Sequence, residues 1–356
     1  MTAIPTSETI TPEWIGEQIR LHGHGDDVVV HAFEAERIGT GQIGKCIRYT
    51  LDLEGGGRET PKSLVGKFAS DDPTSRATGM ALNSFIKEVS FYQKLQGRVR
   101  IETPDCYYAA IDGNGPDFML LLQDLAPARQ GDQLAGCDAR VASRAVGELV
   151  GLHAPSWCDP DMRAHEWLGE PTADAGAFAH ELYTLQLPAF LERFRDRIEP
   201  DEADIITRMA ESESVWQLSD GLKTLIHVDY RLDNLLINEE TDPPFVCAVD
   251  WQSITVGNPL SDVAYFMGAG MLPEDRRLHE AQIVETYWSA MCDAGIAEYD
   301  FKQCWKDYRR GTFAGFVVTV VAAPMVEQTE RGDEMFTVMA RRHARHALDL
   351  DADEFL

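Results

Sequence analysis

A polar pattern that could support catalysis lies in the second half of the chain. The stretch TLIHVDYRLDN holds His227, Asp229 and Asn234 in an H-x-D-x-x-x-x-N spacing, and the apolar run FVCAVD ends further on at Asp250. Phosphoryl transfer requires a carboxylate near the attacking hydroxyl and oxygen ligands that hold magnesium on the nucleotide phosphates. This pattern supplies both kinds of group.

Each residue of the pattern has an expected role. Asp229 would orient, and could deprotonate, the acceptor hydroxyl. Asn234 and Asp250 would offer oxygen ligands to magnesium, a hard cation that takes few protein ligands alongside phosphates and waters. We expect His227 to pack and form a hydrogen bond beneath the loop rather than to touch substrate.

Three charged residues nearby have more than one interpretation. Asp233 could brace the loop or act directly, and Asp262 in NPLSDVAYF could cap the helix that follows Ser261 or act directly. Arg231 could pair with an anionic substrate or with a carboxylate of the loop. These alternatives stay open at the level of the sequence.

A glycine-rich segment lies upstream, where Gly39, Gly41 and Gly44 match G-x-G-x-x-G and Lys45 and Cys46 follow. Dinucleotide-binding and Walker A motifs must open a helix, whose N-terminal amides bind phosphates. Here the next residues, CIRYTLDLEGGG, alternate like a strand, and Cys46 replaces the hydroxyl that would ligate magnesium. We therefore expect a β-hairpin, which either covers nucleotide phosphates or is an ordinary glycine-rich turn.

A lysine and a glutamate form the next candidate pair. Lys67 sits in the apolar strand-like run SLVGKFAS, where a cation is costly to bury without a partner. In the following helical stretch, Phe85, Val89 and Tyr92 share one face, and Glu88 points toward the same side. Glu88 would then pair with Lys67 and hold it toward the nucleotide α- and β-phosphates. The alternative is an edge-of-sheet lysine and a partly exposed glutamate.

The segment LLLQDLAPARQGD indicates a hinge, because an apolar strand turns polar and proline-bearing there. We expect the backbone from Leu122 to Asp124 to form hydrogen bonds with adenine. The chain would divide into an N-terminal helical extension at 1–28, a nucleotide-binding lobe at 29–124 and a helical catalytic and substrate lobe at 125–356.

Hydrophobic patterning predicts an α+β fold with two lobes. A short helix is expected at 12–22, with Pro12 in its first turn. Alternating runs predict a small antiparallel sheet, accompanied by one main helix, with strands at Val28–Ala32, Lys45–Leu53, Ser63–Ala69, Cys106–Asp112 and Phe118–Leu122. From about residue 137 helical patterns prevail, so the second lobe should be larger and mostly helical.

Composition narrows the possible partners. The 356 residues are 44% hydrophobic and 26% charged, as in ordinary globular proteins, but the net charge is -27. Such a surface repels phosphates, so we expect neither a nucleic-acid partner nor an anionic membrane. It would favour cationic substrates, although solubility or a salty cytoplasm is the explanation that we prefer. Oligomeric state cannot be read from the sequence.

Cysteine usage and the N-terminus favour the cytoplasm. The seven cysteines show no C-x-x-C spacing, so neither a disulfide framework nor a zinc site is expected. The start MTAIPTSETITPEW lacks the features of a signal peptide. The longest apolar run, Phe313 to Val326, is too short to span a bilayer comfortably and should be a buried helix.

Taken together, these motifs resemble the aminoglycoside phosphotransferase and choline kinase superfamily, with its protein-kinase-like fold, over roughly residues 30 to 350. HVDYRLDNLLI resembles the family loop HGDxxxxN, and AVDWQSITVGNPLSDVAYF resembles its magnesium-binding segment. The VDWQ stretch and the tail TERGDEMFTVMARRHARHAL are most similar to the ecdysteroid-kinase-like branch. YRLDNLLI also resembles kinase domains that act on hydroxyacyl-CoA.

The resemblance implies that Asp229 is the catalytic aspartate, Asn234 and Asp250 are metal ligands, and Lys67 with Glu88 anchors phosphates. One departure is position 228, where the family usually has glycine and this chain has valine, whose Cβ would crowd the loop.

The leading hypothesis is an ATP- and Mg²⁺-dependent phosphotransferase that acts on a hydroxyl of a small molecule. The acceptor could be an aminoglycoside, a choline-like amine, a hydroxysteroid or a hydroxyacyl compound. The alternatives are an inactive nucleotide-binding pseudokinase and a dinucleotide-dependent oxidoreductase built on GTGQIG.

Overall fold

The chain folds into two compact units in the computed structural model, which describes residues 3–39, 43–169, 172–217, 222–325 and 328–356. The first unit contains Met1–Arg98, Thr103–Pro127 and Asp250–Ser253, and the second contains Val99–Glu102, Ala128–Val249 and Ile254–Leu356. The predicted fold class, a small antiparallel sheet and a larger helical part, is confirmed.

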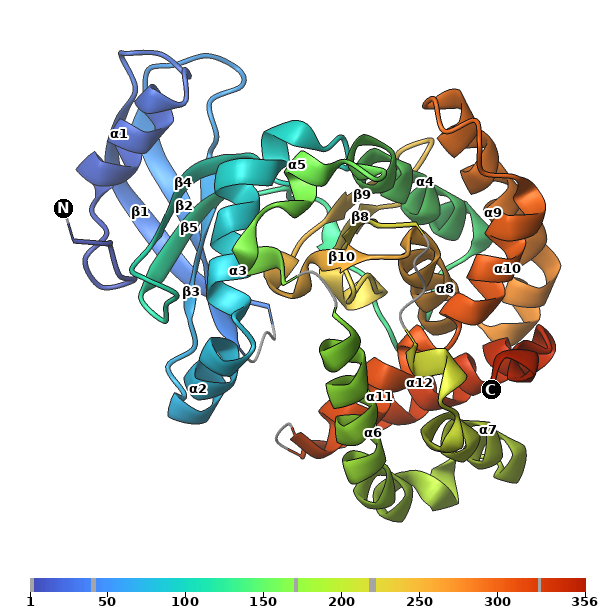
Figure 1. Ribbon diagram of the computed structural model, residues 1–356. Helices are drawn as coiled ribbons and strands as arrows, with labels where there is room; N and C mark the ends of the chain where they lie inside the picture. Colours follow the sequence, from blue (N-terminus) through green and yellow to red (C-terminus); the bar gives the residue numbers. More distant parts are fainter. Residues whose placement is uncertain (1–2, 40–42, 170–171, 218–221, 326–327) are drawn as a thin grey trace. The chain divides into compact units, whose positions relative to one another are not determined.

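The first unit is built on a five-stranded antiparallel sheet in the order β1-β2-β3-β5-β4 (Figure 1). Its strands are β1 (Val29–Ile38), β2 (Gly44–Glu54), β3 (Ser63–Ala69), β4 (Cys106–Ile111) and β5 (Phe118–Gln123). From Tyr49 to its end β2 alternates between more buried and exposed side chains, whereas β5 runs almost fully buried. All five predicted strands are present; the bounds agree within one residue except at the end of β1, which runs on from the predicted Ala32 to Ile38.

The glycine-rich segment joins β1 to β2 as a hairpin. Ile38 pairs with Cys46 in antiparallel register, and Gly39 has a φ of 73°, which glycine adopts without strain. No helix begins after Gly44, because β2 does. The Walker A and dinucleotide-binding alternatives are therefore wrong, since both need a helix there. Gly41 lies outside the described residues.

Three α-helices accompany this sheet, the N-terminal helix and the main helix that we expect and one more. Helix α1 (Pro12–Leu21) begins after the Thr11 cap and buries Ile15 and Ile19. Helix α2 (Pro73–Ala81) was not predicted, although Asp72 caps it and Pro73 opens it. Its weak apolar pattern explains the omission, since Gly79 alone is buried.

The helix that carries Glu88 changes its winding midway. It runs as α3 (Ser84–Ser90), widens into the π-helix η1 (Phe91–Leu95) and ends in η2 (Gln96–Arg98). The wider turn buries Phe91 as well as Tyr92, so the inward face is broader than a regular helical spacing would make it.

The second unit is mostly helical, as predicted. Its α-helices are α4 (Ala139–Ser156), α5 (Pro160–Arg163), α6 (Ala173–Phe194), α7 (Pro200–Glu211), α8 (Pro259–Gly270), α9 (Pro273–Asp293), α10 (Phe301–Gly311), α11 (Ala314–Met325) and α12 (Glu330–Asp349). Single turns of 3-10 helix lie at η3 (Glu166–Leu168), η4 (Arg195–Arg197), η5 (Ser214–Trp216), η6 (Leu232–Asn234) and η8 (Ala352–Phe355).

Short strands frame the H-x-D-x-x-x-x-N pattern in this unit. They are β6 (Arg129–Gln130), β7 (Thr224–Ile226), β8 (Leu235–Asn238), β9 (Phe245–Ala248) and β10 (Thr255–Gly257). β7 pairs with β10, and β6, β8 and β9 form a second small sheet. The loop with Asp229 therefore leaves β7 and enters β8, with both ends fixed by backbone hydrogen bonds.

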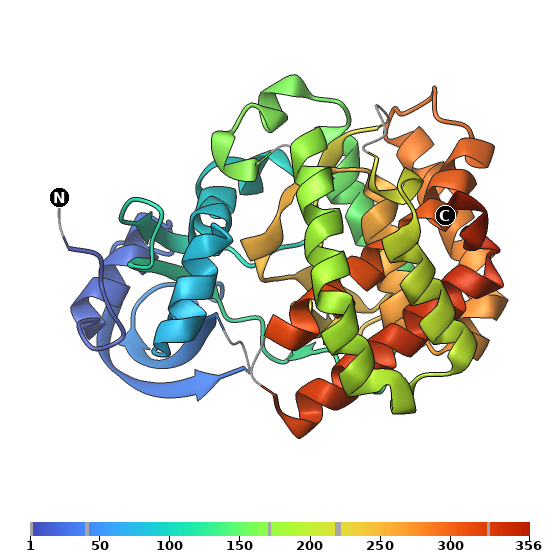
Figure 2. The ribbon, with the colours of Figure 1, turned by 60° about the horizontal axis from the view of Figure 1, so that its bottom comes forward.

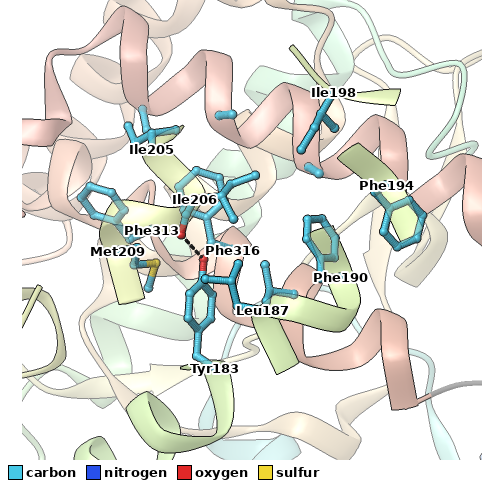
Figure 3. Packing of buried hydrophobic residues seen from close by; sticks show 14 of the residues in the cluster. Tyr183, Leu187, Phe190, Phe194, Ile198, Ile205, Ile206, Met209, Phe313 and Phe316 are labelled. Atoms are coloured by element: carbon cyan, nitrogen blue, oxygen red, sulfur yellow. Dashed lines mark hydrogen bonds between the residues drawn. The ribbon is translucent and has the colours of Figure 1, made fainter. Parts of the chain in front are cut away.

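An aromatic and aliphatic cluster forms a core of the second unit (Figure 3). It combines Tyr183 and Phe190 of α6, Ile206 of α7 and Phe316 of α11, and the Tyr183 hydroxyl donates to the Ile206 carbonyl over 2.9 Å. Figure 2 shows α6 and α7 side by side, with the red α12 crossing behind them.

Helix α11 confirms the expected buried helix in the apolar run after residue 313, with Phe316 and Val320 fully buried. Across the part of the chain that the structure describes, no helix combines the length and the apolar character needed to cross a membrane.

Candidate functional site

Three charged side chains meet in the first unit. The Lys67 ammonium on β3 lies 2.7 Å from Glu88 Oε1 and 2.7 Å from Asp250 Oδ1. The expected pairing of Lys67 with Glu88 is therefore present, and Asp250 joins them from a distant part of the chain. One ammonium between two carboxylates leaves the group with a net negative charge.

Burial and charge act against each other on Lys67. Burial disfavours the ammonium, but the attraction of Asp250 and Glu88 outweighs it and raises the pKa of Lys67 above its usual value. Burial raises the pKa of the Glu88 carboxyl, although Lys67 opposes that effect. Lys67 therefore stays charged.

Asp250 is held in place through its neighbour in the chain. The Trp251 ring stacks on Phe91 of the π-helix, with ring centroids 3.8 Å apart and planes 8° apart. Asp250 itself has a φ of 67°, in the left-handed region, and comes two residues after the end of β9. We had not singled out Trp251 or Phe91, because their contact depends on the π-turn.

The predicted phosphate-covering hairpin approaches the same lysine. A Cβ on Gly44 would lie 3.1 Å from Lys67 Cε and 3.2 Å from the Phe68 carbonyl oxygen, so glycine permits this close approach. Cys46 pairs with Lys67 across β2 and β3, and burial raises the pKa of its thiol to about 11. Gly39 is exposed at the turn.

The predicted hinge residues lie at the end of β5. Leu122 is buried and pairs with Val65, and Gln123 closes the strand. The Asp124 carboxylate accepts hydrogen bonds from Arg48, over 2.6 Å to Nε. The Asp124 side chain is thus committed to Arg48, which leaves only the backbone of this segment for the adenine contact that we predict.

In the second unit the Asp229 carboxylate is surrounded by donors. Oδ1 accepts from the Tyr265 hydroxyl over 2.8 Å and from Arg231 Nε over 3.0 Å. Oδ2 accepts from Asn234 Nδ2 over 2.9 Å. Burial tends to raise the pKa of Asp229, but Arg231 and the Tyr265 hydrogen bond outweigh it and lower that pKa. The carboxylate is therefore ionised and held in one orientation.

The open alternatives for Arg231 and Asp233 are decided by distance. Arg231 Nη1 donates to Asp233 Oδ2 over 2.6 Å while Nε holds Asp229, so Arg231 pairs with carboxylates of its own loop. Asp233 also accepts from the Gln133 backbone N–H over 3.3 Å, and its carbonyl accepts from Gln130 over 2.7 Å. Asp233 braces the loop.

Asp262 anchors the loop rather than capping a helix. Asn258 caps α8, and the buried Asp262 carboxylate accepts from the backbone N–H of His227 over 2.7 Å and of Val228 over 2.9 Å. Val228 has a φ of 74°, an outlier for a β-branched residue. The Cβ of Val228 strains the backbone in this conformation, and the two hydrogen bonds to Asp262 offset that strain.

His227 lies beneath the loop, as expected. It is fully buried, and its Nε2 lies 3.0 Å from the Val249 carbonyl oxygen. Val249 also donates its N–H to the Asn234 carbonyl over 3.0 Å. His227 and Asn234 thus fix the strand end that leads into Asp250.

Each of the two proposed magnesium ligands carries an oxygen donor. In the second unit Asn234 uses its amide nitrogen on Asp229, which leaves its amide oxygen as the donor, and in the first unit Asp250 offers a carboxylate. Both are hard oxygen donors of the kind that magnesium takes alongside phosphates. Among the described residues, no group of three or more His, Cys, Asp or Glu could hold a metal ion.

The predicted residues therefore gather in two groups. Lys67, Glu88, Asp250 and Gly44 come together in the first unit, and Asp229 and Asn234 come together in the second. Tyr265 belongs to the second group, and we had not predicted it as a site residue, although it stands in the quoted DVAYF stretch. Its signal was a tyrosine that follows an acidic residue on a buried helix.

Solved structures with this fold include a kinase and a phosphotransferase. Choline kinase from Cryptosporidium parvum aligns with a TM-score of 0.54 at 8% identity, over 90% of this chain and 89% of that chain. The GDP complex of aminoglycoside 2'-phosphotransferase-IIIa aligns with a TM-score of 0.51 at 16% identity, over 92% and 97%. At such identities these similarities establish the fold.

Curated relatives match only a short segment. Acyl-CoA dehydrogenase family member 11 of Homo sapiens is 40% identical over 48 residues, which are 14% of this chain and 6% of that protein. Family member 10 of Mus musculus is 44% identical over 50 residues, 14% of this chain and 5% of that protein. The chain thus covers a small fraction of the length of these relatives.

A family model covers far more of the sequence. The model of the ecdysteroid kinase-like family matches residues 39–295, which is more than half of the 356 residues. The matched range includes both groups of candidate residues. The protein therefore belongs to the ecdysteroid kinase-like family.

Proposed function

We propose that the protein is an ATP- and Mg²⁺-dependent phosphotransferase that moves the γ-phosphoryl group to a hydroxyl of a small molecule. The observation that carries this proposal is the Asp229 carboxylate, ionised and oriented by Tyr265, Arg231 and Asn234. The Lys67, Glu88 and Asp250 group supports it, because it offers an ammonium for the phosphates of a nucleoside triphosphate and a carboxylate for magnesium.

Lys67 would bind the α- and β-phosphates while Glu88 holds its ammonium in place. The ion pair with Asp250 accounts for a charged lysine in a largely buried setting. Asp250 and Asn234 would hold magnesium, which neutralises charge on the phosphates when bound. The hairpin with Gly39, Gly41 and Gly44 would cover those phosphates.

Asp229 would accept a hydrogen bond from the acceptor hydroxyl and align its oxygen with the γ-phosphorus. As the new oxygen–phosphorus bond forms and the bond to the leaving ADP breaks, the hydroxyl proton passes to Asp229. The lowered pKa of Asp229 makes it a weak base, so orientation rather than early proton removal is its main contribution.

A screen that measures ADP formation would identify the class of acceptor. The panel contains aminoglycosides, choline-like amines, hydroxysteroids and hydroxyacyl-CoA compounds. The net charge of -27 favours cations by attraction, whereas an apolar pocket would favour a steroid or acyl compound. ATP and GTP are compared as donors in the same screen.

The role of Asp229 is tested by Asp229→Ala. We expect turnover to fall about 10³-fold, with nucleotide binding largely unchanged in calorimetry. Lys67→Ala should weaken both turnover and ATP binding, because it removes the phosphate contact. The control Asp204→Ala, at an exposed carboxylate of α7, should change neither.

Two outcomes would overturn these assignments. Loss of ATP binding equal to the loss of turnover in Asp229→Ala would remove Asp229 from the acceptor side. ATP binding without ADP formation across the whole panel would instead support the pseudokinase alternative.

A further inference from the structure

Helix α12 lies beyond residue 295, where the family match ends, yet it reaches the surroundings of Asp229. Near its start, Met335 Sδ lies 3.3 Å from Arg231 Nη1, and Arg231 in turn holds Asp229. One helix therefore touches a residue that orients the carboxylate. A second residue of α12, His343, contacts Tyr265, whose hydroxyl also holds the Asp229 carboxylate.

His343 occupies a narrow slot between two other helices. A Cβ on Gly268 of α8 would lie 2.6 Å from His343 Nδ1, and a Cβ on Gly315 of α11 would lie 2.2 Å from the same atom. Any larger residue at either position would collide with the imidazole. Glycine at both walls thus leaves room for this ring.

The imidazole is fully buried, and neither ring nitrogen has a hydrogen-bond partner within the described part of the chain. Burial, together with positive charge at His346 and Arg342, lowers the pKa of His343 to about 3. His343 is therefore a neutral, flat ring. An unpaired buried imidazole is costly, so hydrogen bonding does not explain its place here.

The His343 ring also contacts the ring of Tyr265. The two rings stack, with centroids 5.3 Å apart and planes 23° apart. The hydroxyl of that tyrosine donates to Asp229 Oδ1 over 2.8 Å. His343 thus lies behind the ring whose hydroxyl orients Asp229.

We propose that His343 is a positioning residue, whose imidazole fixes the Tyr265 ring so that its hydroxyl stays on Asp229. The proposal rests on the proposed function, because it assigns to α12 a part in orienting the catalytic carboxylate. His343 touches neither substrate nor nucleotide in this role and acts only through Tyr265.

Kinetics test the proposal. His343→Ala should lower kcat about 10-fold and leave the KM for ATP within about twofold. Tyr265→Phe should have a similar effect. The variant that combines His343→Ala with Tyr265→Phe should have a kcat no lower than Tyr265→Phe alone, since both changes remove the same hydrogen bond. Val320→Ala, a buried truncation in the core around α11, controls for lost stability and should leave kcat unchanged.

A second variant separates positioning from folding. In His343→Ala/Gly315→Ala the new methyl group fills part of the vacated slot, so stability should recover while kcat stays low. A kcat within twofold of Val320→Ala, in either His343 variant, would overturn the proposal. Full additivity with Tyr265→Phe would overturn it as well.

A crystal structure of His343→Ala/Gly315→Ala gives a readout that needs no activity. The Tyr265 hydroxyl should have left Asp229 Oδ1, and persistence of the 2.8 Å bond would refute the role of His343. If the wild-type enzyme turns over no acceptor, the proposed function fails, and this structure still decides whether the imidazole positions Tyr265.

Discussion

At the scale of single residues, the Asp229 loop combines strain with strong anchoring. Val228 occupies the left-handed region, where a β-branched side chain crowds the backbone. Asp262 accepts from the backbone N–H of Val228 and from that of His227 before it, and it is itself buried. The loop therefore keeps a conformation that its own sequence disfavours, because a distant carboxylate holds it.

Replacing this valine by glycine should relieve the strain. We expect Val228→Gly to raise the free energy of unfolding by about 1 kcal/mol, the relieved strain exceeding the flexibility that glycine adds to the unfolded chain. Urea unfolding followed by circular dichroism measures the change. Val263→Gly, inside helix α8, is the control and should destabilise the protein. A destabilised Val228→Gly variant would show that the strain is negligible.

The site residues that could be inferred from the sequence are those with a local spacing. Glu88 follows from the face shared with Phe85 and Val89, and its contact with Lys67 is observed at 2.7 Å. The contacts of Asp262 and Tyr265 could not be inferred in this way, because their partners in the Asp229 loop lie more than 30 positions away. Long-range packing decides those contacts, and no local pattern encodes it.

At the scale of elements, strand alternation was a reliable guide and helix winding was not. β3 was predicted with its observed bounds, since its apolar run ends at polar residues. The π-turn η1 has no sequence signature, yet it seats Phe91 against Trp251 beside Asp250. The hairpin of β1 and β2 was predicted from alternation after Gly44, and the observed strand there excludes a phosphate-binding helix.

The approach of β2 to Lys67 leads to a prediction about Gly44. Gly44→Ala would place a methyl group 3.1 Å from Lys67 Cε and 3.2 Å from a backbone oxygen, so the lysine must move. We expect the KM for ATP to rise about threefold to tenfold, with a small change in melting temperature. Gly57→Ala, in a turn with open space around the new methyl group, is the matched control. Equal KM values for the two variants would remove Gly44 from the phosphate side.

At the scale of the whole molecule, charge and burial set the response to pH. The net charge of -27 means that carboxylates dominate the surface, and they begin to bind protons near pH 4. Buried histidines respond earlier. His343 and His346 of α12 are fully buried, and burial lowers the pKa of both below the ordinary value of 6.5. Their protonation is therefore linked to unfolding of the second unit.

Because of this linkage, the protein should begin to lose stability at pH values above those at which its carboxylates bind protons. Below pH 6.5 the unfolded chain binds a proton at His343, but the folded protein does not until its pKa of about 3. The stability that the neutral ring contributes is complete above pH 6.5 and is lost as pH falls toward 3, by about 1.4 kcal/mol per pH unit. Urea unfolding at about pH 7.5 and about pH 5 measures the loss. His343→Leu should remove the part of this stability loss that comes from protonation of one histidine, whereas His279→Leu, at an exposed histidine, should leave the loss unchanged. Equal acid sensitivity in the wild type and His343→Leu would mean that His343 is protonated in the folded protein.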